Sequence, residues 1–198
     1  MRIRPTESTQ ILLVPIKDAE QNKRFLTKEE QLELDNKNSQ QRRNEWSTWR
    51  RTVREELGLN TSIWYDEVGA PHVKTKNGEE IHVSVSHSSS HVAIMFSKTH
   101  CGLDIEHCER NFERIKNKYL SSEEEQLASE ERTKAVIWCA KEAIYKYAGC
   151  RKLDLRRDIV IIAADWKQKQ LTAELRGTQL PSLHFIEFED QIICWLTE

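Results

Sequence analysis

Two stretches of the chain carry carboxylates and cations at spacings that place them on common faces. A predicted strand contains Asp104 and Glu106, and residues two apart on a strand point the same way. A predicted helix contains Glu142 and Lys146, and residues four apart on a helix share a face. If this strand and this helix pack side by side, three carboxylates converge beside one ammonium group.

Three carboxylates in one place repel each other and resist ionisation unless a cation joins them. Oxygen ligands without a cluster of cysteine or histidine indicate Mg²⁺ rather than zinc. Because Mg²⁺ takes few protein ligands and completes its shell with water and substrate phosphates, the pattern predicts an enzyme that handles phosphate.

Composition limits the class of protein. The chain has 198 residues, with 30 Lys and Arg against 32 Asp and Glu and a formal net charge of −2. This balance argues against broad, nonspecific binding of nucleic acid. No apolar run approaches membrane-spanning length, so we expect no membrane association. The five cysteines include no CxxC pair and indicate reduced thiols in a cytoplasmic protein.

A long helix is predicted from near Ser39 to Leu57, with an apolar stripe at helical spacing. Arg42, Arg43 and Arg50 lie in line with this stripe or on its flank. They either extend to solvent from a core-facing helix or form an anion site at the edge of a cleft. Spacing alone favours the first interpretation.

Residues 81–86 alternate between apolar and polar, which predicts a strand. His87 then begins a serine-rich turn that includes Ser88. Imidazole and hydroxyl donors in such a turn can bind phosphate, although for His87 alone ordinary hairpin polarity is the better explanation.

The predicted elements run strand, two helices and strands, and then repeat that order. We therefore expect an α+β fold of two similar lobes, residues 1–98 and 99–198, that form a pseudo-dimer in one chain. A cleft between two lobes is a common place for a ligand, so the active site is expected there. Two lobes in one chain favour a monomer.

Three motifs in this order resemble those of the 4'-phosphopantetheinyl transferase superfamily: Ser84–Ser88, Gly102–Glu106 and Trp138–Lys146. The longer, pseudo-dimeric type that activates peptide synthetases is the closer match. The resemblance spans about residues 42–150. Each motif is weak alone, but three with suitable gaps are a strong signal.

The resemblance implies transfer of 4'-phosphopantetheine from coenzyme A to a serine of an acyl or peptidyl carrier protein, with release of adenosine 3',5'-bisphosphate. Asp104, Glu106 and Glu142 would hold Mg²⁺, with Mn²⁺ as an alternative. Glu142 would accept the serine proton, directly or through water. Lys146 would neutralise the leaving group, with Lys141 as a second cation.

Coenzyme A would be bound mainly by the N-terminal lobe, and the C-terminal lobe would carry the metal and the catalytic groups. His87 would bind a phosphate oxygen with help from Ser86 or Ser88. The candidates for the 3'-phosphate are Arg42, Arg43 and Arg50.

One turn departs from the family pattern. Family members often carry a lysine where this chain has Ala70, so the resemblance implies weaker binding of the coenzyme A nucleotide unless Lys74 or Lys76 replaces that cation. Carrier proteins of the family are acidic, so a basic segment is a candidate for docking, with a solvated turn as an equal alternative. Its residues are Arg114, Lys116 and Lys118.

Two other functions compete with this prediction. A Mg²⁺-dependent phosphodiesterase or nuclease also needs clustered carboxylates and would use the arginine-rich helix on nucleic acid. A noncatalytic relic would bind coenzyme A or a carrier without transfer. The intact set of Asp104, Glu106, Glu142 and Lys146 favours the transferase.

Overall fold

The computed structural model describes residues 1–198 and confirms the predicted α+β class. The chain divides into two compact units, Met1–Lys98 and Thr99–Glu198. Each unit contains one antiparallel sheet of six strands together with its own helices.

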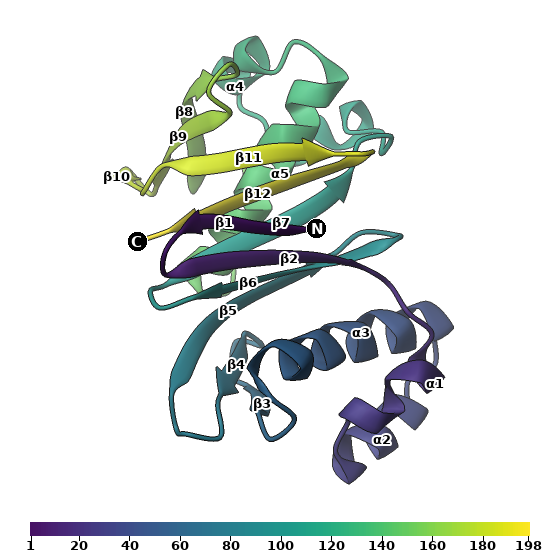
Figure 1. Cartoon of the computed structure of the whole chain (residues 1–198). Coiled ribbons are helices and arrows are strands. Elements are labelled where there is room, and N and C mark those ends of the chain that lie inside the picture. The colour runs from purple at the N-terminus through teal and green to yellow at the C-terminus, as the bar shows by residue number, and fades with distance from the viewer. The chain divides into compact units, whose positions relative to one another are not determined.

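The N-terminal unit has strand order β1-β2-β6-β5-β4-β3. Helix α3 lies across one face of this sheet (Figure 1). The elements of the unit are β1 (Arg2–Thr6), β2 (Thr9–Pro15), α1 (Ala19–Asn22), η1 (Lys23–Phe25), α2 (Lys28–Asp35), α3 (Gln40–Leu57), β3 (Ser62–Tyr65), β4 (Pro71–Lys74), β5 (Glu80–His87) and β6 (His91–Ser97).

An N-terminal cap and an apolar face that packs on the sheet stabilise helix α3. The side chain of Ser39 accepts a hydrogen bond from the backbone N–H of Arg42, which caps the helix, and Gly58 ends it with a φ of 100°. Trp49 and Val53 pack onto the sheet in a shared hydrophobic cluster. Helices α1 and α2 pack against α3 in turn.

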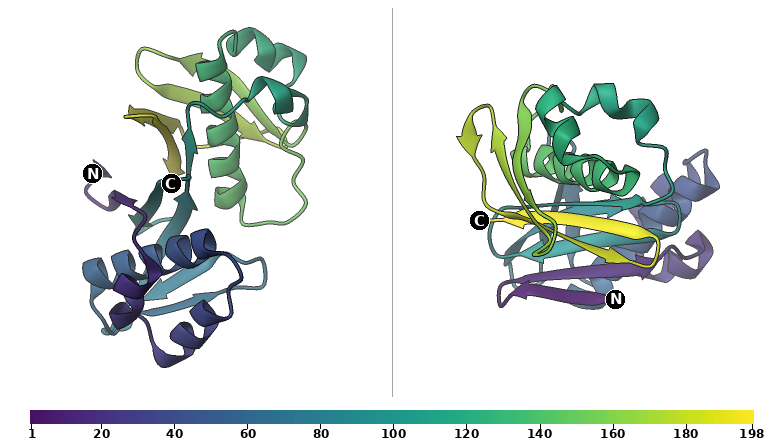
Figure 2. Two further views of the ribbon diagram at one scale, coloured as in Figure 1. Left: turned by 90° about the vertical axis from the view of Figure 1, so that its right-hand side faces the viewer. Right: turned by 90° about the horizontal axis from the view of Figure 1, so that it is seen from above.

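The C-terminal unit has strand order β10-β9-β11-β12-β7, with β8 paired to β9. Helix α5 packs against β7 and β12, and it runs alongside these strands in the left view of Figure 2. The elements of the unit are β7 (Cys101–His107), η2 (Glu113–Lys118), α4 (Ser122–Leu127), α5 (Glu131–Ala148), β8 (Ile159–Asp165), β9 (Gln170–Leu175), β10 (Thr178–Gln179), β11 (Leu183–Phe188) and β12 (Gln191–Thr197).

Some elements differ from those that the sequence predicts. Residues 69–71 carry a turn signal in the sequence, but β4 already begins at Pro71, because pairing with β3 and β5 overrides that signal. The capping-box pattern that begins at Ser121 predicts a helix to about Glu131, but this helix, α4, ends at Leu127. A new helix begins after Glu130 because Glu130 and Thr133 cap each other's backbone N–H groups.

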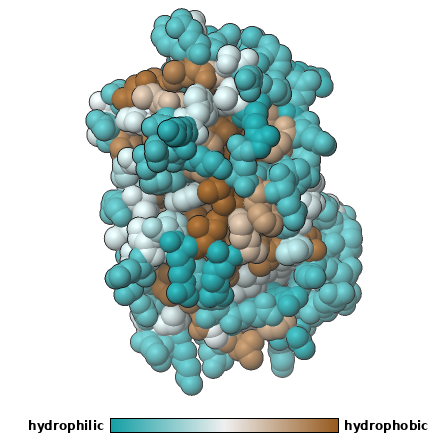
Figure 3. Space-filling model, turned by 45° about the horizontal axis from the view of Figure 1, so that its top comes forward, coloured by the Kyte–Doolittle hydropathy of each residue, from teal (hydrophilic) through white to brown (hydrophobic).

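The molecular surface is largely hydrophilic on the face drawn in Figure 3, with hydrophobic side chains gathered in patches. No helix of the structure combines the length and the apolar character needed to cross a membrane.

Gly102 on β7 allows α5 to approach the strand very closely. A Cβ atom at this position would lie 2.3 Å from the backbone oxygen of Ala143 and 2.7 Å from Cβ of Tyr147. Both neighbouring atoms belong to helix α5, so they cannot move aside without displacing the helix. The glycine of the strand motif therefore fixes the distance between β7 and α5.

Replacing Gly102 by alanine should destabilise the protein by about 1–3 kcal/mol, because the added methyl group overpacks the contact between strand and helix. Urea denaturation measures this loss, and hydrogen exchange should locate the loosened amides in β7 and α5. An unchanged urea midpoint for Gly102→Ala would contradict the packing argument.

Candidate active site

The carboxylates of β7 face the polar stripe of α5. Lys146 donates a hydrogen bond from Nζ to Oδ1 of Asp104 at 2.8 Å. Trp138 donates from Nε1 to Oε1 of Glu106 at 2.6 Å. Glu142 lies one helical turn from each of these two helix residues and on the same side of α5. The alternation of the strand and the period of the helix thus bring the predicted groups together.

The carboxylates of this cluster disfavour one another's ionisation. Burial and the negative charge of Asp104 together raise the pKa of Glu142 to about 6, and the charge of Lys146 opposes this shift. Burial and Asp104 also raise the pKa of Glu106, against the hydrogen bond from Trp138 and the charge of Arg110. This is the electrostatic signature of a site that favours a bound cation.

Arg110 belongs to this cluster and was not predicted from the sequence. Its Nη1 donates to Oε1 of Glu106 at 2.7 Å, and its guanidinium lies 5.0 Å from the centre of the Trp138 ring. One carboxylate oxygen of Glu106 therefore receives two donors. The only feature of the sequence that points to Arg110 is its position four residues after Glu106. Because Arg110 lies in a turn, no helical or strand period predicts which way its side chain points.

The chemistry of the cluster fits Mg²⁺, because its ligands are hard oxygens whose mutual repulsion a divalent ion would relieve. In the structure as it stands, no group of three or more His, Cys, Asp or Glu side chains is arranged to hold a metal ion. The cations Lys146 and Arg110 compensate part of the negative charge instead.

Lys141 does not take part in this cluster. Its side chain is fully buried, and Nζ donates to Glu124 at 2.8 Å and to the backbone oxygens of Tyr119, Leu155 and Ile159 at 2.6, 2.9 and 2.8 Å. All of its donors have partners, so the ammonium has none left for a phosphate. The prediction that Lys141 contacts coenzyme A is corrected here to a structural role.

A pocket of about 350 Å³ in the N-terminal unit combines aromatic walls with charged groups. Its rings come from α3 and β3, and Gly69 leaves room beside them. The lining residues are Lys37, Arg42, Glu45, Trp46, Trp49, Tyr65, Gly69, Pro71, Val85 and His87. Such a lining suits a planar aromatic group that carries negative charge.

Arg42 and His87 meet at the rim of this aromatic pocket. Nη1 of Arg42 lies 3.2 Å from Nε2 of His87, and Oε2 of Glu45 lies 3.4 Å from the same ring nitrogen. The Arg42 side chain is 69% exposed, whereas Glu45 is buried. The rim therefore offers an accessible guanidinium and an imidazole that one buried carboxylate positions.

Arg50 lies beneath the aromatic walls rather than in the pocket. Its guanidinium stacks 3.6 Å from the ring centre of Trp46 and 4.3 Å from that of Trp49, and it pairs with Glu30 at 3.2 Å. Only 2% of the residue is exposed. Arg50 therefore braces the rings, which corrects the prediction that it binds the 3'-phosphate directly.

Arg43 also points away from the aromatic pocket. Its Nη2 pairs with Asp35 at 3.2 Å and lies 3.7 Å from Glu20, which ties α3 to the helices before it. Arg43 does not line the pocket. Of the three predicted arginines, the structure leaves Arg42 as the one available to a ligand there.

Ser86 and Ser88 lie on either side of His87, and both are buried. The hydroxyl of Ser88 accepts hydrogen bonds from the backbone N–H groups of Ser90 and His91 at 3.4 and 3.2 Å. Ser88 therefore shapes the turn between β5 and β6 that holds His87 in place.

The predicted carrier-docking residues form the 3-10 helix η2. Lys116 pairs with Glu113 at 2.8 Å and with Glu125 at 3.4 Å. Arg114 and Lys118 are exposed. This basic segment is therefore ordered, and two of its three cations project to solvent.

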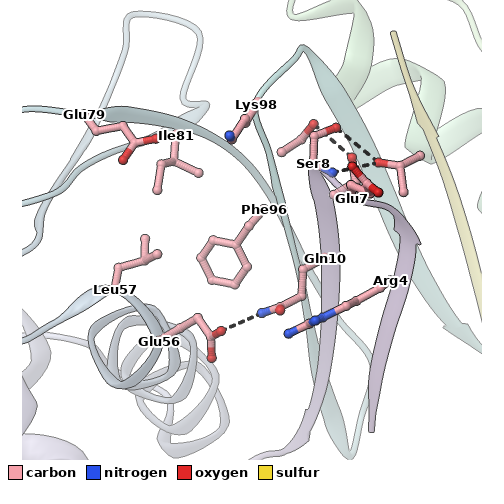
Figure 4. Close-up of a pocket in the computed structure, with 13 residues that line it drawn as sticks. Arg4, Glu7, Ser8, Gln10, Glu56, Leu57, Glu79, Ile81, Phe96 and Lys98 are labelled. Atoms are coloured by element: carbon pink, nitrogen blue, oxygen red, sulfur yellow. Dashed lines mark hydrogen bonds between the residues drawn. The ribbon is translucent and has the colours of Figure 1, made fainter.

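Another pocket of the N-terminal unit, of about 750 Å³, contains none of the predicted residues. Figure 4 shows Phe96 in its middle, with Leu57 and Ile81 to one side and Glu56 reaching toward Gln10. Glu56 accepts a hydrogen bond from Gln10 at 2.8 Å. Its wall charges are of both signs, and they do not select one class of ligand.

Lys141→Met should destabilise the protein by about 3–5 kcal/mol, because it leaves the buried carboxylate of Glu124 without its partner. Thermal and urea unfolding measure the loss. Lys134→Met is the control, since Lys134 lies on the same helix but pairs with surface carboxylates. If Lys141→Met kept its stability and lost only affinity for coenzyme A, the structural role would be wrong.

Comparison with known proteins gives one family match, and it covers the segment that carries the carboxylate cluster. A comparison with curated proteins finds no match to the chain. A scan against family models matches residues 100–195, just under half of the 198 residues, and this segment contains β7, α5 and the whole carboxylate cluster. The matching model is that of the 4'-phosphopantetheinyl transferase superfamily.

Proposed function

We propose that this protein transfers the 4'-phosphopantetheine group of coenzyme A to a serine of an acyl or peptidyl carrier protein. The observation that supports this most strongly is the cluster of three carboxylates and Lys146 on β7 and α5, inside the segment that matches the superfamily. We further propose that the chain is a monomer of the longer, two-lobed type that activates peptide synthetases.

In this proposal the aromatic pocket of the N-terminal unit binds the nucleotide of coenzyme A. The rings of Trp46, Trp49 and Tyr65 supply faces for an adenine. Arg42 and His87 supply donors for phosphate oxygens at the rim.

Lys37 is the cation that replaces the missing lysine at Ala70. It lines the aromatic pocket, and its Nζ lies 4.8 Å from the centre of the Trp46 ring. Lys37 also pairs with Glu33 at 3.0 Å, as Lys74 does with Glu80 at 3.0 Å, so their ion pairs do not distinguish them. The distinction is that Lys74, which the sequence offers for this role, does not line the pocket.

Asp104, Glu106 and Glu142 would hold Mg²⁺ or Mn²⁺. When bound, the metal would neutralise charge on the pyrophosphate of coenzyme A. The residues of the chain then supply positioning and proton transfer, which are the main requirements of phosphoryl transfer.

The reaction itself breaks one phosphorus–oxygen bond and forms another. The serine oxygen of the carrier attacks the β-phosphorus, and the electron pair of the broken bond leaves with adenosine 3',5'-bisphosphate. Glu142, whose pKa is raised to about 6, is still largely ionised at neutral pH and can accept the serine proton. The ammonium of Lys146 stabilises negative charge on the leaving group.

Two other functions make different predictions for the same assay. A phosphodiesterase would release adenosine 3',5'-bisphosphate from coenzyme A without a carrier. A noncatalytic relic would bind coenzyme A and release nothing. A transferase releases the bisphosphate only when an apo carrier protein is present.

Glu142→Gln should lower this carrier-dependent release at least about a hundredfold, because a metal ligand and a proton acceptor are lost together. Coupled assay of the bisphosphate measures the rate, and circular dichroism should show an intact fold. Glu109→Gln makes the same chemical change at an exposed site and should keep full activity. Near-normal turnover of Glu142→Gln would remove Glu142 from the mechanism.

Arg42→Ala should weaken binding of adenosine 3',5'-bisphosphate about tenfold without loss of stability, because an exposed charge-assisted contact is removed. Arg50→Ala should instead destabilise the fold by about 2 kcal/mol, because a desolvated stack on two indole rings is lost. Isothermal titration and urea denaturation separate the two effects. The opposite result, with Arg50 acting only on affinity, would overturn the assignment of the pocket.

A further inference from the structure

A groove of about 740 Å³ lies in the C-terminal unit between η2 and the connection from α5 to β8. It is separate from the carboxylate cluster, with which it shares no lining residue. Its lining residues are Asn117, Lys118, Ser121, Leu153, Asp154, Leu155, Arg156 and Arg157. We propose that this basic groove docks an acidic surface of a partner protein, which under the proposed function is the carrier.

The groove carries a net positive charge, and its cations are accessible to a partner. Lys118, Arg156 and Arg157 are exposed, and Arg157 is 85% exposed in its side chain. The one acidic side chain of the lining, Asp154, accepts hydrogen bonds from the backbone N–H groups of Arg156 and Arg157 at 2.9 and 3.0 Å. Asp154 also lies 3.9 Å from Nε of Arg157, so the acid shapes the loop and compensates one charge in part, while all three cations stay exposed.

Lys141 joins the two walls of the groove. Its buried ammonium donates to the backbone oxygen of Tyr119, which follows η2, and to that of Leu155 on the opposite wall. Arg156 adds a longer contact of 3.5 Å to the backbone oxygen of Asn117. The walls are therefore held at a fixed separation before any partner arrives, which lowers the entropy lost on docking.

The lining favours a protein over other anions. It contains no aromatic side chain, whereas single-stranded nucleic acids are bound by stacking of bases on aromatic rings. An open groove of about 740 Å³ is much larger than a phosphate ion. Leu153 and Leu155 add apolar contact between the cations, as in the mixed surfaces of protein interfaces.

The groove also refines the docking segment that the sequence predicts. Lys118 belongs to both sets, whereas Lys116 is held by Glu113 and Glu125. Arg156 and Arg157 lie almost forty residues further along the chain, so only the fold brings them beside Lys118. The identification of the partner as a carrier protein rests on the proposed function. The expectation that the partner surface is acidic rests on the groove alone.

The test compares the double variant Arg156→Glu/Arg157→Glu with the matched control Lys167→Glu/Lys169→Glu. The control makes the same charge change at two exposed lysines in the turn between β8 and β9, outside the groove. The probes are an apo acyl carrier protein and its serine-to-alanine form, which can bind but cannot accept the group. Carrier affinity is measured by fluorescence anisotropy of the serine-to-alanine form, and KM by the release assay.

We expect the groove variant to weaken anisotropy binding and raise the carrier KM at least tenfold, with an unchanged Kd for coenzyme A. The control variant should stay within twofold of the wild type.

Wild-type binding by the groove variant would overturn the proposed docking site but would not contradict the proposed transferase function. Tight, groove-dependent binding without any transfer would support the docking site and contradict the proposed function. Preference of the groove for a single-stranded oligonucleotide over the carrier would also overturn the proposal.

Discussion

The contact between β7 and α5 is the constraint on which the candidate active site depends. Gly102 lets the helix approach until only a hydrogen atom fits between the strand and the backbone of Ala143. At this separation the strand presents Asp104 and Glu106 to the helix, and the helix presents Lys146 and Trp138 in return. A larger side chain at position 102 would push apart both rows of functional groups at once.

Helix α5 uses its neighbouring residues for opposite purposes. Glu142 faces the other carboxylates, where burial and like charge keep it poised to take up a proton. Lys141, one position earlier, points into the core, where Glu124 and three backbone oxygens surround its ammonium. The same helix therefore carries the face with Glu142 and Lys146 and, through Lys141, holds the walls of the basic groove.

The periods of a strand and a helix determine which side chains share a face, and from them the sequence predicts that Lys146 lies beside Asp104. It fails where the partner of a side chain comes from a distant element. Nothing near Arg50 in the sequence reveals that it lies against the rings of Trp46 and Trp49 and pairs with Glu30. Arg110 escapes prediction for a related reason, since it reaches Glu106 from an irregular turn.

The central claim is that this chain transfers phosphopantetheine, and intact-mass spectrometry tests it most directly. An apo acyl carrier protein and an apo peptidyl carrier protein would each be incubated with the protein, coenzyme A and Mg²⁺. The account predicts a mass gain of one phosphopantetheine group on at least one carrier, and loss of that gain when a chelator is added. No gain on either carrier, while the protein binds coenzyme A, would contradict the claim and leave a coenzyme A-binding protein without transferase activity.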